Sequence, residues 1–99
     1  ILGMEARREW DTGIMIDTGS GLLEIFHNGK GFQHTGALRH FALCCEDVDQ
    51  IVEKIKAAGY DVFEGPKDIC IPSSPPLYAR IAFCTGPLKE EIELFQENK

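Results

Sequence analysis

Two glutamates and one histidine stand in apolar segments that have the pattern of β-strands: Glu24, His40 and Glu93. Each glutamate is set between aliphatic residues and is followed two positions later by a phenylalanine. Because alternate residues of a strand share a face, each carboxylate shares its predicted face with that phenylalanine. An anion on an apolar face is costly to desolvate unless its charge is compensated, and a metal cation would compensate it.

The three residues form a carboxylate–imidazole–carboxylate donor set. Zinc, nickel, cobalt, manganese and ferrous iron all accept such donors, and the set does not select among them. Each residue taken alone is more often a solvent-facing or structural strand residue than a ligand. Their joint occurrence, one on each predicted strand, favours a divalent metal site made by Glu24, His40 and Glu93. His27 and His34 are weaker candidates because they lie at or beyond a strand end in a glycine-rich connector.

The clearest predicted element that could position these residues is a helix over residues 47–58. Asp47 followed three positions later by Gln50 fits a capping box, and Gly59 supplies a left-handed stop. The apolar residues recur at steps of three and four and predict one buried stripe. They are Val48, Ile51, Val52, Ile55 and Ala58.

The segment 38–96 around this helix has the pattern strand, helix, strand, strand, strand. Three prolines between positions 72 and 76 require a loop, because proline removes a ladder donor and fixes the backbone angle. Gly86-Pro87 marks a tight turn before the last strand. The segment is therefore predicted to form a βαβββ unit. Its strands are expected over residues 38–45, 60–64 continuing towards 71, 78–84 and 91–96.

Residues 1–30 have the pattern of the end of another such unit, with strands over 4–10, 13–17 and 22–26. Leu23-Glu24-Ile25-Phe26 corresponds to Ile92-Glu93-Leu94-Phe95, and a second short match occurs in the same order. This unit lacks the opening strand and helix of the other. We therefore expect its core face to be covered by residues upstream of Ile1 or by a second chain.

Composition restricts the classes of partner. The chain of 99 residues has a formal net charge of −6 and no basic stripe that could displace counterions from nucleic acid. No apolar run approaches the roughly 20 residues of a membrane span, and no leader sequence is apparent. A single domain this small has a thin stability margin, so a homodimer is expected.

The cysteines predict a reducing compartment. None of the four shows a CxxC spacing, and each lies in or beside an apolar segment. We expect reduced, partly buried thiols, which is in keeping with a cytoplasmic protein. The four residues are Cys44, Cys45, Cys70 and Cys84.

Five short motifs of the second unit resemble those of the glyoxalase, bleomycin-resistance and dioxygenase (vicinal oxygen chelate) superfamily. They are Arg-His-Phe-Ala-Leu (39–43), Glu-Asp-Val-Asp (46–49), Ala-Ala-Gly-Tyr (57–60), Ala-Arg-Ile-Ala-Phe (79–83) and Glu-Ile-Glu-Leu-Phe-Gln (91–96). The resemblance covers residues 38–96 and, less specifically, residues 1–27. It implies an α+β fold of paired βαβββ modules that form a cleft, the first module here lacking its opening strand and helix.

The resemblance also implies roles for the three candidate ligands. His40 matches the first-strand metal ligand of the second module and Glu93 its last-strand ligand, while Glu24 matches the last-strand ligand of the first module. The fourth position, usually His or Gln on the opening strand of the first module, has no counterpart and would lie upstream of Ile1.

By this resemblance the chain is expected to be a lyase or isomerase of lactoylglutathione-lyase type that acts on a small substrate with vicinal oxygens. In that mechanism the metal stabilises an enediolate and a glutamate, here Glu93, moves the proton between neighbouring carbons. Glutathione or another thiol is the cosubstrate that the resemblance suggests, although no glutathione-binding signature is present. The alternatives are an epimerase and a metal-free ligand-sequestering domain of bleomycin-resistance type. A dioxygenase is less favoured because such chains are longer.

Overall fold

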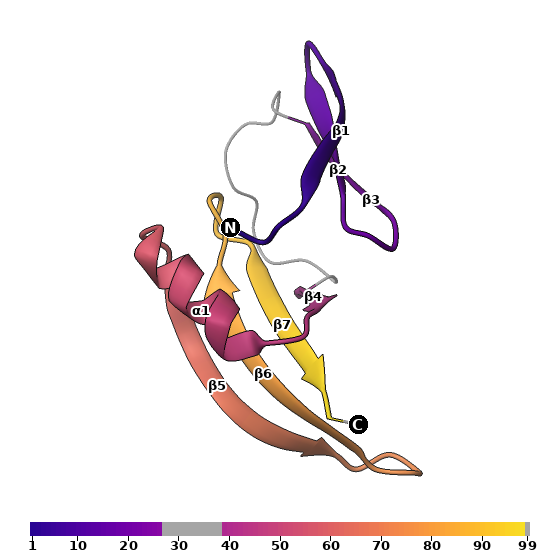
Figure 1. Cartoon of the computed structure of the whole chain (residues 1–99), viewed down its shortest axis with the longest axis vertical. Coiled ribbons are helices and arrows are strands. Elements are labelled where there is room, and N and C mark those ends of the chain that lie inside the picture. Colours follow the sequence, from indigo (N-terminus) through magenta and orange to yellow (C-terminus); the bar gives the residue numbers. More distant parts are fainter. Residues whose placement is uncertain (27–38, 99) are drawn as a thin grey trace. The chain divides into compact units, whose positions relative to one another are not determined.

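The structure, a computed structural model, describes residues 1–26 and 39–98 (Figure 1). The chain divides into two compact units, Ile1–Gln33 and His34–Lys99. The first contains an antiparallel sheet in the order β1-β2-β3, formed by β1 (Glu5–Trp10), β2 (Gly13–Asp17) and β3 (Leu22–Phe26). The second contains β4 (Phe41–Cys44), α1 (Val48–Ala57), β5 (Val62–Ile71), β6 (Leu77–Thr85) and β7 (Glu91–Glu97).

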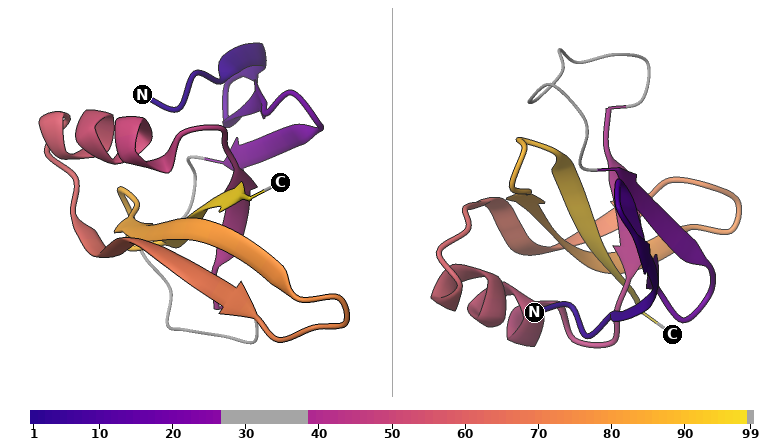
Figure 2. Two further views of the ribbon diagram at one scale, coloured as in Figure 1. Left: turned by 60° about the horizontal axis from the view of Figure 1, so that its bottom comes forward. Right: turned by 90° about the horizontal axis from the view of Figure 1, so that it is seen from above.

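The second unit has the predicted βαβββ order, and the α+β fold class is confirmed. Its sheet has the order β4-β7-β6-β5, in which β4 runs parallel to β7 while β6 is antiparallel to both of its neighbours. The long hairpin of β5 and β6 curves strongly, and α1 lies along one face of the sheet (Figure 2). The opposite face carries Ala79 and Ile81, which are buried without contact to the helix face.

The helix α1 begins and ends within one residue of the predicted limits. Oδ1 of Asp47, the N-cap, accepts a hydrogen bond of 3.1 Å from the backbone N–H of Gln50. Gly59 follows the C-cap with φ +90°, the left-handed conformation that glycine adopts without a steric penalty. Ala58 is exposed, contrary to the predicted stripe, because it lies at the C-cap beyond the last helical residue.

The core of the second unit lies between α1 and the middle of the sheet. The carbonyl oxygen of the Gln96 side chain accepts a hydrogen bond of 2.9 Å from the backbone N–H of Val48, so β7 also supports the first turn of the helix. Alternation along β7 directs Leu94 into the core and Glu93 to the opposite face. On the helix face the buried apolar side chains are Val48, Val52, Ile55, Ala82, Cys84 and Leu94, whereas Ala79 and Ile81 are buried on the opposite face.

Two strands begin more than one residue later than predicted. The strand before the helix begins at Phe41, so His40 lies immediately before β4, and Leu38 lies outside the described residues. The strand after the helix begins at Val62 and not at Tyr60. The reason is that the backbone N–H of Tyr60 donates to the carbonyl of Ile55 at 3.1 Å and still belongs to the helix end.

The cysteines carry free thiols, but not all of them are buried. Cys84 is buried and Cys45 is half-buried, whereas Cys44 and Cys70 are exposed, contrary to expectation. Among the described residues, α1 is the sole helix, and neither its length nor its apolar content would let it cross a membrane.

Candidate metal centre

The structure brings His40 and Glu93 together. Nε2 of His40 lies 3.2 Å from Oε1 of Glu93, which is a hydrogen-bonding distance. Pairing of β4 with β7 places Ala42 beside Glu93, and His40 lies two positions before Ala42 on the same side of the strand. The side chain of Glu93 is 13% exposed and that of His40 is 38% exposed, so the pair is partly desolvated and still accessible.

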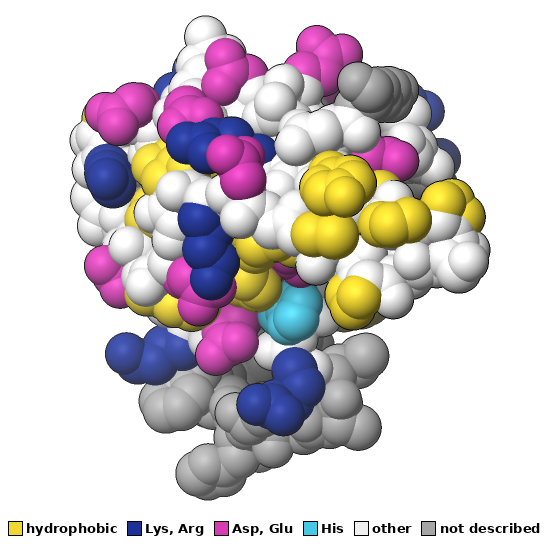
Figure 3. Space-filling view, turned by 90° about the horizontal axis from the view of Figure 1, so that it is seen from below, with side chains coloured by type: hydrophobic (Ala, Val, Ile, Leu, Met, Phe, Trp, Pro, Cys, Tyr) yellow, Lys and Arg dark blue, Asp and Glu magenta, His cyan; other side chains and the backbone are white. Residues whose placement is uncertain are grey.

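Two phenylalanines extend this pair into a cluster. Phe83 on β6 lies directly opposite Glu93, so both side chains project from the same face of the sheet. The ring of Phe83 meets the imidazole of His40 edge to face, with centroids 5.1 Å apart and planes at 85°. Phe63 on β5 contacts the other side of Phe83, with centroids 5.9 Å apart. Figure 3 shows a histidine at the surface with acidic and hydrophobic side chains beside it.

The donor atoms of His40 and Glu93 have a spacing that suits a shared cation. Two donors that each lie about 2.0–2.2 Å from one ion, at about 90–110° to each other, are roughly 2.8–3.6 Å apart. The observed 3.2 Å falls in that interval. The pair therefore fits two ligand positions of a divalent metal, with one nitrogen and one oxygen donor.

The third predicted ligand belongs to the other unit. Glu24 lies on β3 in register with Met15 and is exposed, as are its same-face neighbours Leu22 and Phe26. The premise that this carboxylate is desolvated by an apolar face is therefore wrong for the first unit as described. Its role as a ligand stays a prediction.

Within residues 1–26 and 39–98, no group of three or more His, Cys, Asp or Glu side chains is arranged to hold a metal ion. His40 and Glu93 thus form a two-ligand half-site in the described part of the chain. The weaker candidates His27 and His34 lie outside the described residues.

A separate charged cluster ties the helix to the face of the sheet opposite the candidate site. Arg80 donates two hydrogen bonds to Asp49, at 2.7 and 3.0 Å, and also lies 3.3 Å from Asp68. These hydrogen bonds from Arg80 hold the pKa of Asp49 below its usual value. Because Arg80 and Phe83 are three positions apart on β6, they project to opposite faces, and this cluster has a structural role.

The thiols nearest the core are not activated as nucleophiles. Burial raises the pKa of Cys45, with a further rise from neighbouring Cys44, and burial also raises the pKa of Cys84. Both thiols are therefore protonated near neutral pH, which disfavours nucleophilic chemistry by either of them.

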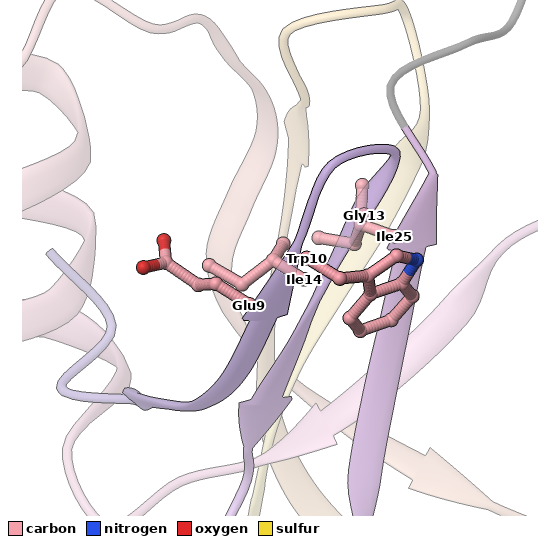
Figure 4. Close-up of a pocket in the computed structure, with 5 residues that line it drawn as sticks. All are labelled: Glu9, Trp10, Gly13, Ile14 and Ile25. Atoms are coloured by element: carbon pink, nitrogen blue, oxygen red, sulfur yellow. The ribbon is translucent and has the colours of Figure 1, made fainter.

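The first unit has a hollow of its own on the three-stranded sheet (Figure 4). It is lined by Glu9, Trp10, Gly13, Ile14 and Ile25. A Cβ at Gly13 would lie 2.7 Å from the indole of Trp10 and 2.8 Å from the carbonyl oxygen of Ile25, so only glycine fits there. In Figure 4 the Glu9 carboxylate and the Trp10 indole point in opposite directions, as alternate residues of a strand do.

No separate signal in the sequence marks Phe63 and Phe83 as neighbours of the site. Phe83 is the last residue of a motif singled out for its family resemblance, but its place opposite Glu93 depends on the register of β6 with β7. Phe63 lies where the pairing of β5 with β6 is irregular, between Val62 and Glu64. Such irregularities re-aim side chains and are not visible in a hydrophobic pattern.

Comparison with known proteins shows which superfamily the chain belongs to. The model of the Glyoxalase/Bleomycin resistance protein/Dioxygenase superfamily matches residues 1–73. The chain belongs to this superfamily. The match includes Glu24 and His40 and ends before Glu93.

Several solved structures share the fold at low sequence identity. A glyoxalase/bleomycin resistance protein/dioxygenase from Alicyclobacillus acidocaldarius is 16% identical, with a TM-score of 0.68 over 99% of this chain and 76% of that one. The protein SMU.1112c is 23% identical, with a TM-score of 0.69 over 95% and 80% of the two chains. An integron cassette protein of V. cholerae is 17% identical, with a TM-score of 0.62 over 96% and 77%. A search of curated proteins gave no match.

Proposed function

We propose that this chain carries the metal-binding face of a lyase or isomerase of glyoxalase type, which acts on a small substrate with vicinal oxygens. The observation that carries the proposal is the approach of His40 Nε2 to within 3.2 Å of Glu93 Oε1, on a carboxylate that is mostly removed from solvent. Membership of a superfamily in which divalent metals are common supports it.

His40 and Glu93 would hold the cation, with Glu24 as the third ligand. Zinc, nickel, cobalt, manganese and ferrous iron suit these donors. When bound, such an ion supplies Lewis-acid polarisation of two adjacent substrate oxygens, which acidifies the neighbouring C–H bond.

Glu93 is the proposed proton carrier. Its carboxylate lies beside the imidazole of His40, and Phe83 is its cross-strand neighbour, so the low exposure strengthens its electrostatic interactions. It would accept the proton from one substrate carbon at a carboxylate oxygen and return it to the neighbouring carbon. Glutathione or another thiol is the proposed cosubstrate, and an epimerase would use the same proton transfer at a single carbon.

Metal binding by the purified chain tests the proposal without a known substrate. Titration calorimetry with zinc, nickel, cobalt or manganese should detect binding to the unmodified chain. His40→Ala and Glu93→Gln should each weaken it by about tenfold or more, because the first removes a ligand and the second replaces a charged ligand with a neutral one. Glu97→Gln is the matched control, since Glu97 is an exposed carboxylate on the same strand and the same face. Equal metal affinity in all four proteins would refute the proposal.

A metal-free ligand-sequestering domain is the second candidate, and the aromatic pair Phe63 and Phe83 favours it because both rings are accessible to a small apolar ligand. The two functions differ in their response to a chelator. A metal-dependent enzyme loses ligand binding when the metal is removed, whereas a sequestering domain retains it.

A further inference from the structure

The outer edge of β5 is protected against pairing along its first half and open along its second half. Among the described residues, β5 is the last strand of its sheet, so one side of its backbone has no neighbouring strand. In the first half, Pro66 has no N–H to donate and Lys67 places a charge on the strand, and both features discourage pairing with another chain. Residues 69–71 have neither feature, and no charged side chain follows until Arg80.

A hydrogen bond in the neighbouring strands shows which backbone groups of β5 point to this edge. The backbone N–H of Asn98 donates to the carbonyl of Tyr78 at 2.9 Å, so the polar backbone groups of Tyr78 are directed to β7. Cys70 lies opposite Tyr78, and in an antiparallel pair of this kind the two residues exchange no hydrogen bonds with each other. The N–H and C=O of Cys70 therefore point to the open edge, and by alternation those of Asp68 do as well.

The side chains at this end of the hairpin are accessible and uncharged. Cys70 is exposed, Ile71 is 37% exposed and Tyr78 is 56% exposed. Figure 1 shows the hairpin of β5 and β6 continuing past α1 to its loop, in agreement with this exposure. Asp68, at the border of the uncharged segment, lies 3.3 Å from Arg80, so its charge is compensated within the chain. An approaching strand would therefore meet apolar side chains and free backbone groups.

The sequence around Cys70 is symmetrical, and this favours a second copy of the chain as the approaching strand. Ile69 and Ile71 flank Cys70. When two copies pair antiparallel about a two-fold axis at Cys70, Ile69 of each copy lies beside Ile71 of the other, on the same face. The two Cys70 residues then exchange both of their backbone hydrogen bonds. Because the chain has a net charge of −6, two copies repel each other least where they meet through an uncharged segment.

We propose that two copies of this chain pair through residues 69–71 of β5, with Cys70 facing Cys70, and so join their four-stranded sheets into one. This interface lies at the edge of the sheet opposite β4 and does not depend on the proposed metal site. In such a hydrogen-bonded pair the Cα atoms are about 5.5 Å apart, within the range of roughly 4.4–6.8 Å that a disulfide spans. Oxidation should therefore trap the interface through the two thiols.

Sedimentation velocity in reducing buffer tests the interface. The unmodified chain should form a dimer whose proportion rises with concentration. Cys70→Pro removes the outward N–H without removing a bond to β6, and it should raise the dissociation constant by about tenfold or more, since two hydrogen bonds are lost. Cys70→Lys should have a similar effect, because two cations would face each other across the axis. Cys70→Ser is the matched control, since it keeps the backbone groups and should keep the dimer.

Oxidation with diamide gives an independent measurement. Two thiols lose their hydrogens to diamide and form one disulfide, while diamide is reduced to the hydrazine. The unmodified chain and Cys44→Ser should give a disulfide-linked dimer on a non-reducing gel. Cys70→Ser should give none, although the thiol of Cys44 is also exposed.

Three results would overturn this interface. They are a monomer at every concentration, a dimer that both Cys70→Pro and Cys70→Lys leave unchanged, and a crosslink that persists in Cys70→Ser. Circular dichroism shows whether each variant is folded. If Cys70→Pro fails to fold, the result with Cys70→Lys decides, because lysine leaves every backbone hydrogen bond of β5 in place.

Discussion

The two sheets of this chain contain nearly the same four residues in very different surroundings. Leu23-Glu24-Ile25-Phe26 on β3 corresponds to Ile92-Glu93-Leu94-Phe95 on β7. Leu94 is 1% exposed, whereas its counterpart Ile25 is 43% exposed. The same pattern of apolar and acidic residues therefore does not by itself bury a strand.

The difference comes from the helix. In the second unit, α1 packs against β5, β6 and β7, so the face of β7 with Leu94 is covered. The first unit has three strands and no helix in residues 1–26. Its sheet therefore leaves Ile25 without a covering layer, and the carboxylate of Glu24 remains exposed on the other face.

Shortening the two corresponding aliphatic side chains should give the largest difference between the sheets. Leu94→Ala should lower the free energy of unfolding by about 2–5 kcal/mol, because it leaves a cavity under α1. Ile25→Ala should cost about 1 kcal/mol or less. Denaturant unfolding measures both. An equal cost for Ile25→Ala would mean that this face is covered in solution, as in the homodimer expected from the sequence, and light scattering would detect that dimer.

The two corresponding glutamates should differ in catalysis. Glu93→Gln should lower turnover of a glutathione hemithioacetal by about two orders of magnitude, because it removes the proposed base. Glu24→Gln should lower metal affinity, with turnover recovered at high metal concentration. Steady-state kinetics over a range of metal concentrations measures both. A Glu24→Gln variant with unchanged metal affinity would remove Glu24 from the ligand set.

A methyl group at Gly13 tests whether the first sheet has a packed side. Gly13→Ala should destabilise this unit by about 1–3 kcal/mol, because the new Cβ overlaps the indole of Trp10 and the backbone of Ile25. Trp10 is the single tryptophan, so its fluorescence maximum should shift. Gly21→Ala is the control, since a Cβ there meets nothing within 4 Å. Identical spectra for both variants would argue against the Trp10–Gly13 contact.

The smallest expected effect concerns the ion pair between Asp49 on the helix and Arg80 on the second sheet. Arg80 lowers the pKa of Asp49 in the folded state, so this pair contributes stability above the usual carboxyl pKa of 3.8. The contribution disappears as the pH falls through the lower folded value. Asp49→Asn should therefore melt slightly earlier than the unmodified chain at pH 7, and the difference should vanish in strong acid. A difference that persists there would have another cause.

Local signals predicted the elements well where turns and caps surround them. The strands Gly13–Asp17 and Leu22–Phe26 were predicted with their observed limits, because glycine-containing turns flank both. The ligand roles of His40 and Glu93 stay a prediction, and what the structure shows is the close approach of the two side chains. It depends on a parallel pairing of the first and last strands, which no local pattern encodes.

The features of the site that the sequence did not predict depend on contacts between distant segments. The exposure of Glu24 could not be predicted from its apolar neighbours, because desolvation is decided by the layer that covers a sheet and not by neighbours on the strand. The positions of Phe63 and Phe83 beside the site depend on the irregular register of β5, for which the sequence shows only Gly65-Pro66. Their accessibility follows from that register as well.

Strand β7 is where this chain can least tolerate an insertion or a deletion. One strand directs Glu93 to His40, places Leu94 under the helix and holds the first turn of α1 through Gln96. A shift of one residue would exchange the two faces and disrupt all three contacts together. The turn from Gly86 to Glu90, closed by a 2.8 Å hydrogen bond, sets this register. Loop-length variation among homologues should therefore spare this turn and accumulate in the proline-rich loop between β5 and β6.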